Sequence, residues 1–380
     1  MRSPEMKKHT QCVHSGTYKE GKTKGVNTPI FTSSSFEYPD AEENVYPRYF
    51  NTVNQRAVAA KLAALENTED GLLFSSGMAA ISTVLLTFLK QGDHALFQRD
   101  VYGGTYHFVR SEFQQYGIDY TFVTNKAGDI ERAIRKNTKV IFIESPSNPL
   151  LKITDISAVA DMAHSRNIIT VIDNTFATPI NQNPHDSGID MIIHSGSKYL
   201  GGHSDICCGA ALGGAAMINA VMKTAVNFGG SLNAATCYLV ERSLKTLGIR
   251  IERQCANAEF IAGSLKNNPL ISKVYYPGLP DHDGHELAKK QMRAFGAVVS
   301  FELDERKYDP DTFIDNLKLI SPALSLGGVE TLICAPASTS HEKMSEEERQ
   351  SIGITKGLFR LSVGIEDADD IRKDIEQALS

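Results

Sequence analysis

Residues 191–204 read MIIHSGSKYLGGHS, in which an apolar run is followed by small residues and glycines around one lysine, Lys198. The apolar run has the length and composition of a buried strand. Similar short apolar runs precede it and are separated by amphipathic stretches with helical spacing, such as residues 156–166. These earlier runs are residues 71–74, 95–97, 120–123, 140–143 and 168–172. Apolar strands that alternate with helices predict an α/β fold with a mainly parallel sheet covered on both faces.

The length of 380 residues predicts more than one domain. Residues 56–245 are expected to form a large α/β domain, and residues 246–380 a smaller domain that mixes helices and strands. A long helical pattern over residues 234–266 is expected to lead from one to the other. Residues 1–55 are rich in Thr, Ser, Asn and Tyr and show little periodicity. This N-terminal arm is therefore expected either to be disordered or to wrap onto a neighbouring subunit.

The composition excludes several kinds of partner. The net charge is -6 and the basic residues are scattered, so there is no electrostatic reason to expect nucleic acid or an anionic membrane. The longest nearly apolar stretch, residues 79–89, is too short to span a bilayer. The first ten residues lack the apolar run of a secretory signal. The six cysteines form no Cys-x-x-Cys pair, so they are expected to be small buried thiols. Unpaired thiols are typical of a reducing compartment, which predicts a cytoplasmic protein.

Three features lie where predicted strands end, which is where parallel sheets bind ligands. Ser76, Gly77 and Met78 begin a helix directly after a strand, and free N–H groups there can bind a phosphate, although an ordinary turn has the same pattern. Asp173 follows a buried strand and would suit a protonated pyridine nitrogen, although a helix-cap aspartate is the simpler alternative. Lys198 could form an imine with a cofactor, or could be an ordinary solvated lysine.

Residues 281–285 read DHDGH and resemble a set of metal ligands. They follow the turn-forming residues 277–280 (PGLP) and have poor spacing for a metal ion. A solvated loop is therefore expected here, and no metal site is predicted.

Taken together, the segments from about residue 27 to residue 370 resemble the Cys/Met-metabolism family of pyridoxal 5'-phosphate (PLP) enzymes. This trans-sulfuration family includes cystathionine synthases and lyases, methionine gamma-lyase and homoserine sulfhydrylases. The stretch around Lys198 is highly specific to the family, and residues 359–366 (FRLSVGIE) match its second signature. The resemblance implies PLP as cofactor and the aspartate aminotransferase-type fold (fold type I), with a smaller α+β C-terminal domain. It also implies a homotetramer formed as a dimer of active dimers.

The resemblance implies roles for individual residues at the cofactor. Lys198 would hold PLP as a Schiff base and later move protons. Asp173 would pair with the pyridine nitrogen, and Tyr102 would stack on the ring. The residues implied to bind the phosphate are Ser76, Gly77, Met78, Ser195 and Ser197.

Further residues are implied at the substrate and at the subunit boundary. Arg360 resembles the clamp for the substrate carboxylate, because a guanidinium group suits a planar anion. Asn148 and Ser325 would complete the pocket. Tyr46 and Arg48 resemble the pair that reaches the phosphate of the neighbouring subunit, which would explain why the N-terminal arm has no core of its own.

The implied function is that of a carbon–sulfur lyase, in which elimination proceeds through a Lys198 aldimine and Tyr102 relays a proton to the leaving sulfur. Relatives that act on cystathionine by gamma chemistry usually carry acidic residues where this chain has Val45 and Leu324. An apolar wall does not compensate a desolvated ammonium group, which favours a substrate with an apolar tail. Gly104 conflicts with this, because methionine gamma-lyases usually carry cysteine there. The prediction is therefore a lyase of methionine or cystathionine type.

Two alternatives stay open. A gamma-replacement enzyme, either a cystathionine gamma-synthase or an O-acyl-homoserine sulfhydrylase, would act on a small sulfur amino acid or its precursor with the same residues. The remote alternative is a PLP-binding relative without turnover. Such a protein would be expected to lose at least one of Lys198, Asp173, Tyr102 and Arg360, and all four are present.

Overall fold

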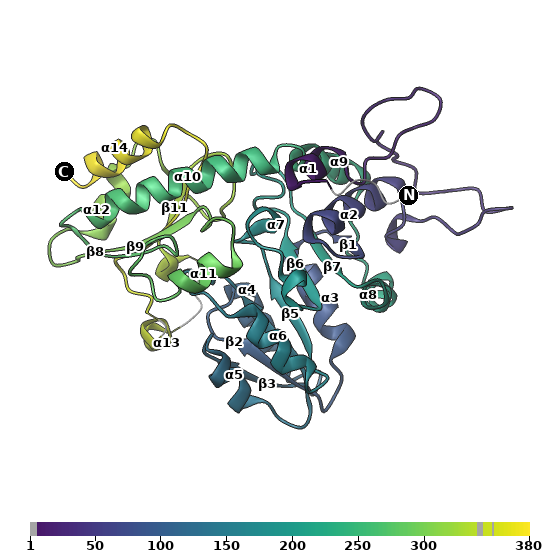
Figure 1. Cartoon of the computed structure of the whole chain (residues 1–380), viewed down its shortest axis with the longest axis horizontal. Coiled ribbons are helices and arrows are strands. Elements are labelled where there is room, and N and C mark those ends of the chain that lie inside the picture. The colour runs from purple at the N-terminus through teal and green to yellow at the C-terminus, as the bar shows by residue number, and fades with distance from the viewer. Residues whose placement is uncertain (1–5, 340–344, 352) are drawn as a thin grey trace.

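The large domain is built on a seven-stranded, mainly parallel sheet (Figure 1). The structure is a computed structural model that describes residues 6–339, 345–351 and 353–380. Strands β2 to β6 pair in parallel, whereas β7 is antiparallel to both β1 and β6. The sheet order is β1-β7-β6-β5-β4-β2-β3. The strands are β1 (Asp70–Phe74), β2 (His94–Gln98), β3 (Asp119–Val123), β4 (Thr138–Glu144), β5 (Ile169–Asp173), β6 (Met191–Ser195) and β7 (Gly209–Gly213).

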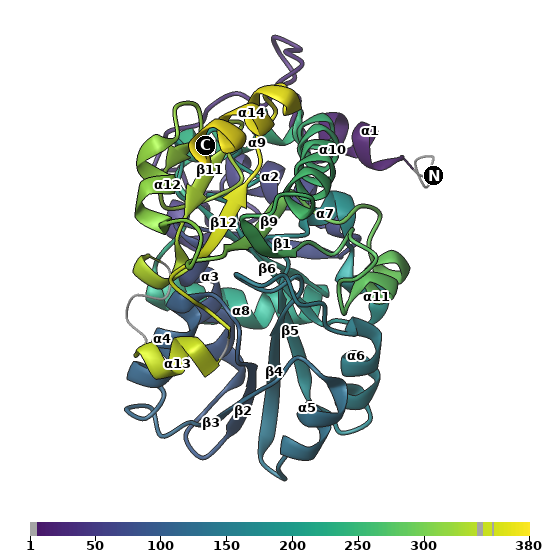
Figure 2. The same cartoon turned by 90° about the vertical axis from the view of Figure 1, so that its left-hand side faces the viewer.

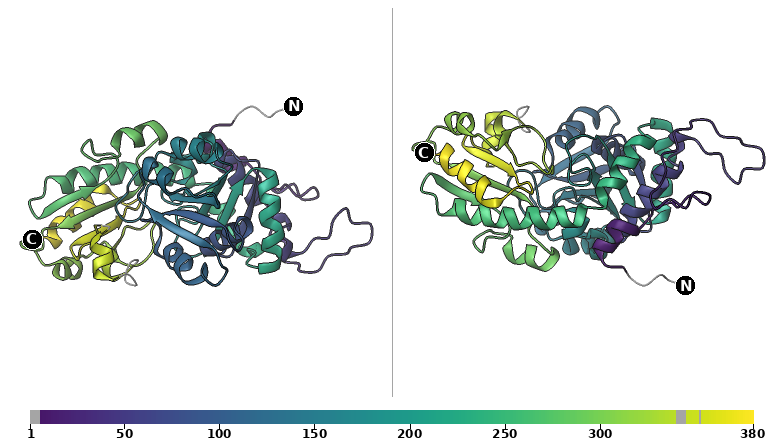
Figure 3. Two further views of the ribbon diagram at one scale, coloured as in Figure 1. Left: turned by 90° about the horizontal axis from the view of Figure 1, so that it is seen from below. Right: turned by 90° about the horizontal axis from the view of Figure 1, so that it is seen from above.

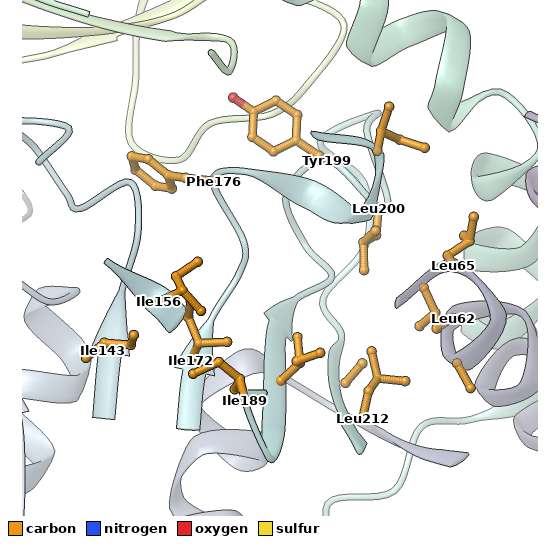
Figure 4. Close-up of a cluster of buried hydrophobic side chains, with 14 of the residues drawn as sticks. Leu62, Leu65, Ile143, Ile156, Ile172, Phe176, Ile189, Tyr199, Leu200 and Leu212 are labelled. Carbon is orange, nitrogen blue, oxygen red and sulfur yellow. The ribbon is translucent and has the colours of Figure 1, made fainter. Parts of the chain in front are cut away.

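Helices cover both faces of this sheet, as the apolar character of its strands predicts. They are α2 (Val53–Glu66), α3 (Gly77–Phe88), α4 (Gly103–Glu112), α5 (Ala127–Ala133), α6 (Ile156–His164), α7 (Thr178–Asn181) and α8 (Ala215–Phe228). Neighbouring strand residues face opposite layers, so Ile172 packs in the core beneath α2 and α6 while Val171 packs in the core beneath α3 and α8. Figure 4 shows part of the first core, with labelled side chains that include Leu62, Leu65, Ile156, Ile172 and Leu212.

The small domain is built on a second sheet of five strands in the order β10-β11-β12-β9-β8. Its strands are β8 (Ile271–Tyr275), β9 (Val298–Leu303), β10 (Ser321–Pro322), β11 (Leu332–Cys334) and β12 (Leu358–Ser362). Its helices are α10 (Leu247–Lys266), α11 (His285–Gln291), α12 (Pro310–Asn316), α13 (Glu346–Ser351) and α14 (Ala368–Ala378). Figure 2 shows α14 and α10 on the same side of this sheet, where their apolar side chains share one core with Phe301 and Phe359.

The predicted helical pattern over residues 234–266 is two helices, α9 (Ala234–Leu244) and α10, which are separated by Lys245 and Thr246. In Figure 1, α10 runs along the top of the molecule from the large domain to the small one. In the parts of the chain that the structure describes, no helix has both the length and the apolar character needed to cross a lipid bilayer.

The N-terminal arm has more core than its sequence suggests. Helix α1 (Lys8–His14) packs on α2 and α10, and Cys12 is only 1% exposed. The amine of the buried Lys61 donates to the carbonyl oxygen of Cys12 at 3.1 Å, which fastens α1 to α2. The segment that follows forms loops that project from the end of the molecule opposite the C-terminus (Figure 3). Residues 1–5 of the predicted arm lie outside the described residues.

Candidate active site

Lys198 lies in the turn after β6, and its amine reaches across to the small domain. The Lys198 Nζ atom donates to Ser325 Oγ at 2.9 Å. Burial, followed by the nearby charge of Arg360, lowers the pKa of Lys198. This shift favours the neutral amine that imine formation needs. The two domains meet closely here, because a Cβ atom on Gly327 would lie 2.6 Å from the backbone nitrogen of Tyr199.

The residues predicted at the phosphate gather at the start of α3. The Ser76 hydroxyl caps this helix by accepting from the Ala79 N–H group at 3.1 Å. The N–H groups of Gly77 and Met78 lie in the first turn, where the helix supplies no acceptors. A Cβ atom on Gly77 would come within 2.9 Å of the Ser195 Cβ atom, so only glycine leaves this cradle open.

Ser197, which directly precedes Lys198, is held by the backbone next to β7. Its hydroxyl oxygen accepts from the Cys208 N–H group at 3.0 Å, which ties the lysine turn to the start of β7. The position also needs glycine next to it, because a Cβ atom on Gly196 would lie 2.1 Å from the Cys208 sulfur atom. Close packing therefore requires a glycine beside Ser197 even before any ligand is considered.

Asp173 is the last residue of β5 and is only 7% exposed. Burial raises the pKa of Asp173, whereas hydrogen bonds from Thr175 lower it. The Oδ1 atom of Asp173 accepts from the Thr175 hydroxyl at 2.5 Å and from its N–H group at 3.0 Å. Thr175 therefore fixes one carboxylate oxygen, and a buried acid of this kind is stabilised by a cationic partner such as a protonated pyridine nitrogen.

Tyr102 stands at the start of α4 and is 44% exposed. Its N–H group donates to the Oε2 atom of Glu144 at 2.8 Å. Its ring lies over Gly104, where an added Cβ atom would meet the Tyr102 Cε1 atom at 2.4 Å. Glu144 therefore anchors the backbone of Tyr102, one face of the ring lies against Gly104, and the other face is open.

Arg360, on β12, is only 5% exposed and lies beside two other predicted residues. Its Nη1 atom donates to Asn148 Oδ1 at 2.9 Å, and its Nη2 atom donates to the Ser325 carbonyl oxygen at 3.0 Å. The buried Nε atom of Arg360 has no hydrogen-bond partner. A buried guanidinium group with an unused donor fits an anionic ligand such as a carboxylate.

The two residues predicted to form the apolar wall lie in different surroundings. Leu324 is 66% exposed and lines a cavity of about 890 Å³ in the small domain, beside α12 and α13. Val45 is half-buried in the N-terminal arm, just before the 3-10 helix η1 (Pro47–Tyr49).

Tyr46 and Arg48 have contacts within their own chain. The Arg48 guanidinium carbon lies 5.8 Å from the ring centre of Tyr46 and 5.3 Å from that of Tyr49. The Arg48 Nη1 atom donates to the Val226 carbonyl oxygen, on α8, at 2.6 Å. The structure therefore brings Gly77 against Ser195 and Asp173 within electrostatic reach of Lys198, whereas Arg48 is held against α8 with Tyr46 beside it.

Two buried acids near the site have no role in the sequence-based prediction. Glu144 ends β4, opposite Asp173 at the end of β5. Glu66 lies within the large domain and is bonded to His194 Nε2 at 2.5 Å and to Asn174 Nδ2 at 2.8 Å. Because Asn174 and His194 directly adjoin Asp173 and Ser195, Glu66 supports the ends of two strands that carry the site.

The DHDGH loop uses its side chains locally. The His285 ring stacks on Phe295, and its Nδ1 atom lies 2.8 Å from the Pro277 carbonyl oxygen. Asp281 forms an ion pair with Lys266 at 2.8 Å. Within residues 6–339, 345–351 and 353–380, no group of His, Cys, Asp and Glu side chains is arranged to hold a metal ion.

The site fits PLP in three respects. The glycine cradle at α3 suits its phosphate, the buried Asp173 carboxylate suits its ring nitrogen, and the Lys198 amine suits its aldehyde. A mainly parallel sheet with these groups at the carboxyl ends of its strands defines a PLP-dependent enzyme of fold type I. The model of the family described as "Cys/Met metabolism PLP-dependent enzyme" matches residues 9–380, and the chain belongs to that family.

Relatives and solved structures agree with this assignment. The chain is 44% identical to the cystathionine gamma-lyase of Bacillus subtilis, with 98% of this chain and 99% of that protein covered. It is 41% identical to an L-methionine gamma-lyase of Fusobacterium nucleatum, with 99% of both chains covered. The crystal structure of the cystathionine gamma-lyase from Lactobacillus plantarum, complexed with L-serine, matches with a TM-score of 0.95, 38% identity and 98% coverage of both chains. The predicted family, fold class and cofactor are confirmed.

Proposed function

We propose that the protein is a carbon–sulfur lyase that eliminates a sulfur group from an amino acid with an apolar tail, such as methionine. The observation that carries the proposal is the position of Ser325. Its hydroxyl accepts from the Lys198 amine, and its carbonyl oxygen accepts from Arg360. A base and a carboxylate clamp that meet at one residue suit an amino acid whose α-carbon lies beside Lys198.

The reaction divides among residues of this chain. PLP, when bound, supplies an electron sink for charge that develops at the α-carbon. Arg360 and Asn148 hold the substrate carboxylate, and Lys198 takes the α proton onto Nζ. Because the leaving sulfur is on the γ-carbon, a second proton must leave the β-carbon before the carbon–sulfur bond breaks, and the Lys198 amine can accept it once it has passed on the first. Tyr102 passes a proton from its hydroxyl to the departing sulfur. Positioned acid–base groups of this kind contribute roughly 100- to 10,000-fold each.

Leu324 supports the choice of an apolar substrate tail. It directly precedes Ser325, and its exposed side chain offers no charge to a distal ammonium group. Where the bound substrate excludes water, leaving such a group unpaired costs several kcal/mol, and about 1.4 kcal/mol is already tenfold in specificity. Methionine and homocysteine are therefore better substrates for gamma-elimination than cystathionine in this proposal.

The test is a comparison of kcat/KM for methionine and cystathionine with PLP-loaded enzyme, in which 2-oxobutyrate and pyruvate are identified as products. Leu324→Glu should raise the preference for cystathionine at least about tenfold, because the new carboxylate can pair with the ammonium group. Leu324→Gln is the control, because glutamine has nearly the size of glutamate but carries no charge. Cleavage of cystathionine to cysteine and 2-oxobutyrate more efficiently than cleavage of methionine by the unaltered enzyme would contradict the apolar-tail proposal. An assay with acyl-homoserine and sulfide as the two substrates tests the gamma-replacement alternative.

We also propose a homotetramer in which Tyr46 and Arg48 reach the phosphate site of a neighbouring subunit. Support comes from the projecting loops of the arm and from the exposure of the Tyr46 side chain. Mixing Arg48→Ala protein with Lys198→Ala protein should restore part of the activity, because half of each hybrid dimer's sites would be intact. No restoration after demonstrated subunit exchange would count against shared sites.

We infer a cytoplasmic location from the thiols. All six cysteines are free, and five of them are buried. Unpaired buried thiols are typical of proteins in reducing compartments. Fractionation of the source cells, with the enzyme detected by its yellow cofactor band, tests this location.

A further inference from the structure

Glu144 is a buried acid to which the proposed reaction gives no role. It lies opposite Asp173 in the parallel pairing of β4 and β5 and is only 4% exposed. Its Oε2 atom accepts from the Tyr102 N–H group at 2.8 Å. Glu144 therefore touches the backbone of the residue proposed to stack on the cofactor ring, and it lies beside the acid proposed to pair with the ring nitrogen.

The surroundings of Glu144 favour its neutral form. Its neighbours include the acids Asp173 and Asp100, and backbone N–H groups of Tyr102 and Asn148 supply its hydrogen bonds. Asp100 has its own cation, because Lys152 Nζ lies 3.4 Å from its Oδ2 atom. Burial, followed by the charge of Asp173, raises the pKa of Glu144 well above its usual range. A neutral carboxyl group still accepts a hydrogen bond through its carbonyl oxygen.

Glu144 supplies the acceptor for the Tyr102 N–H group, and the Tyr102 carbonyl oxygen accepts from the Tyr106 N–H group at 3.0 Å. Two glycines, Gly103 and Gly104, follow it in the first turn of α4 and provide no side-chain wall. Tyr102 is 44% exposed, and its ring packs on the Gly104 backbone. The position of the backbone from which the ring projects therefore decides where the ring lies.

We propose that Glu144 is a positioning residue that holds Tyr102 over the cofactor ring through its hydrogen bond to the Tyr102 N–H group. The inference rests on the proposed role of Tyr102. In this role, the Glu144 side chain must accept a hydrogen bond but need not carry a negative charge. Glutamine keeps the acceptor without a charge, whereas alanine removes it and takes away the side-chain acceptor of the part-buried Tyr102 N–H group.

The experiment compares Glu144→Gln and Glu144→Ala with the unaltered protein, each loaded with PLP. Glu144→Gln should keep kcat and the pH profile within about threefold, because the acceptor is retained. Glu144→Ala should lower kcat by about 10- to 30-fold with little change in KM, because Tyr102 is displaced while the carboxylate clamp is intact. The visible circular dichroism of the bound cofactor should change in the alanine variant alone. Adding Tyr102→Phe to Glu144→Ala should cost less than Tyr102→Phe costs by itself.

Two results would overturn the inference. One is a glutamine variant as impaired as the alanine variant, because a charge would then be required. The other is an alanine variant with unchanged kcat and unchanged circular dichroism. If the alanine variant does not fold, Glu144→Asp takes its place with the same expectations, because its shorter side chain withdraws the acceptor. The dichroism is measured without substrate, so it tests Glu144 even if the proposed lyase activity is wrong.

Discussion

The two ends of the large sheet bury polar side chains in opposite ways. At the amino end, the His94 ring is fully buried and both nitrogens have partners: Nδ1 lies 2.8 Å from Thr138 Oγ1, and Nε2 lies 3.0 Å from Thr121 Oγ1. At the carboxyl end, Glu144 and Asp173 are buried side by side, and burial raises the pKa of both acids. His94 is neutral and satisfied, whereas Asp173 at the carboxyl end gains from a ligand that brings a cation.

This difference separates polar groups that serve the fold from those that serve a ligand. A satisfied neutral group has no reason to bind anything further. A cluster with unmet charges and unused donors is costly until a ligand supplies the partners. Substitutions at the carboxyl end of the sheet should therefore mainly lower activity, whereas substitutions at the amino end should lower only the stability of the fold.

Lys198→Ala should have the largest effect on activity. Without the amine, neither covalent attachment of PLP nor removal of the α proton is possible, and turnover should fall by at least about a thousandfold. The protein should also lose the absorption band that borohydride removes from the unaltered enzyme. Lys266→Ala, which removes an exposed lysine that pairs with Asp281, is the matched control and should keep both properties. Normal turnover by Lys198→Ala protein would refute the assignment.

Arg360→Lys should have the next largest effect. Lysine keeps the charge but cannot bond Asn148, the Ser325 carbonyl oxygen and a carboxylate at once, so KM should rise by about 100-fold. Steady-state kinetics with methionine measure this change. The exposed Arg306→Lys is the matched control. A KM within threefold of the unaltered value would argue against Arg360 as the carboxylate clamp.

His94→Gln should have the smallest effect, and only in acid. Burial, followed by the charge of Arg135, lowers the pKa of His94 from 6.5 to about 4 in the folded protein. The unfolded chain therefore binds more protons between these values, and stability is lost as the pH falls from about 6.5 toward 4, by at most about 3 kcal/mol.

Glutamine can bond both threonines without titrating, so the variant should lose less stability over this range. Denaturant unfolding at pH 7 and pH 4.5 measures the difference. Its activity at pH 7 should equal that of the unaltered enzyme. An acid dependence identical to that of the unaltered protein would exclude His94 as the source.

The sequence predicts those strands and site residues that belong to a local pattern, in which an apolar run is followed by polar or small residues. Asp173 was identifiable because it directly follows a buried apolar run, and Lys198 because it lies in the glycine- and serine-rich turn after the next such run. Glu144 follows such a run too, but its partner is the N–H group of Tyr102, which only the folded chain brings near. Strand β7 escaped prediction because its sequence, GAALG, consists mainly of small residues that suit a crowded position beside α3. Helix α1 escaped because its core is supplied by α2 and α10.

Ser325 and Leu324 are neighbours with opposite freedom to vary during evolution. Ser325 has a backbone φ of +92° and contacts Lys198 with its side chain and Arg360 with its carbonyl oxygen. Most replacements there would disturb the base and the clamp together. Leu324 projects into a cavity and is 66% exposed. Under the proposed function, in which position 324 faces the substrate tail, a lineage can change the tail that it accepts through this position while Ser325, one residue away, stays intact.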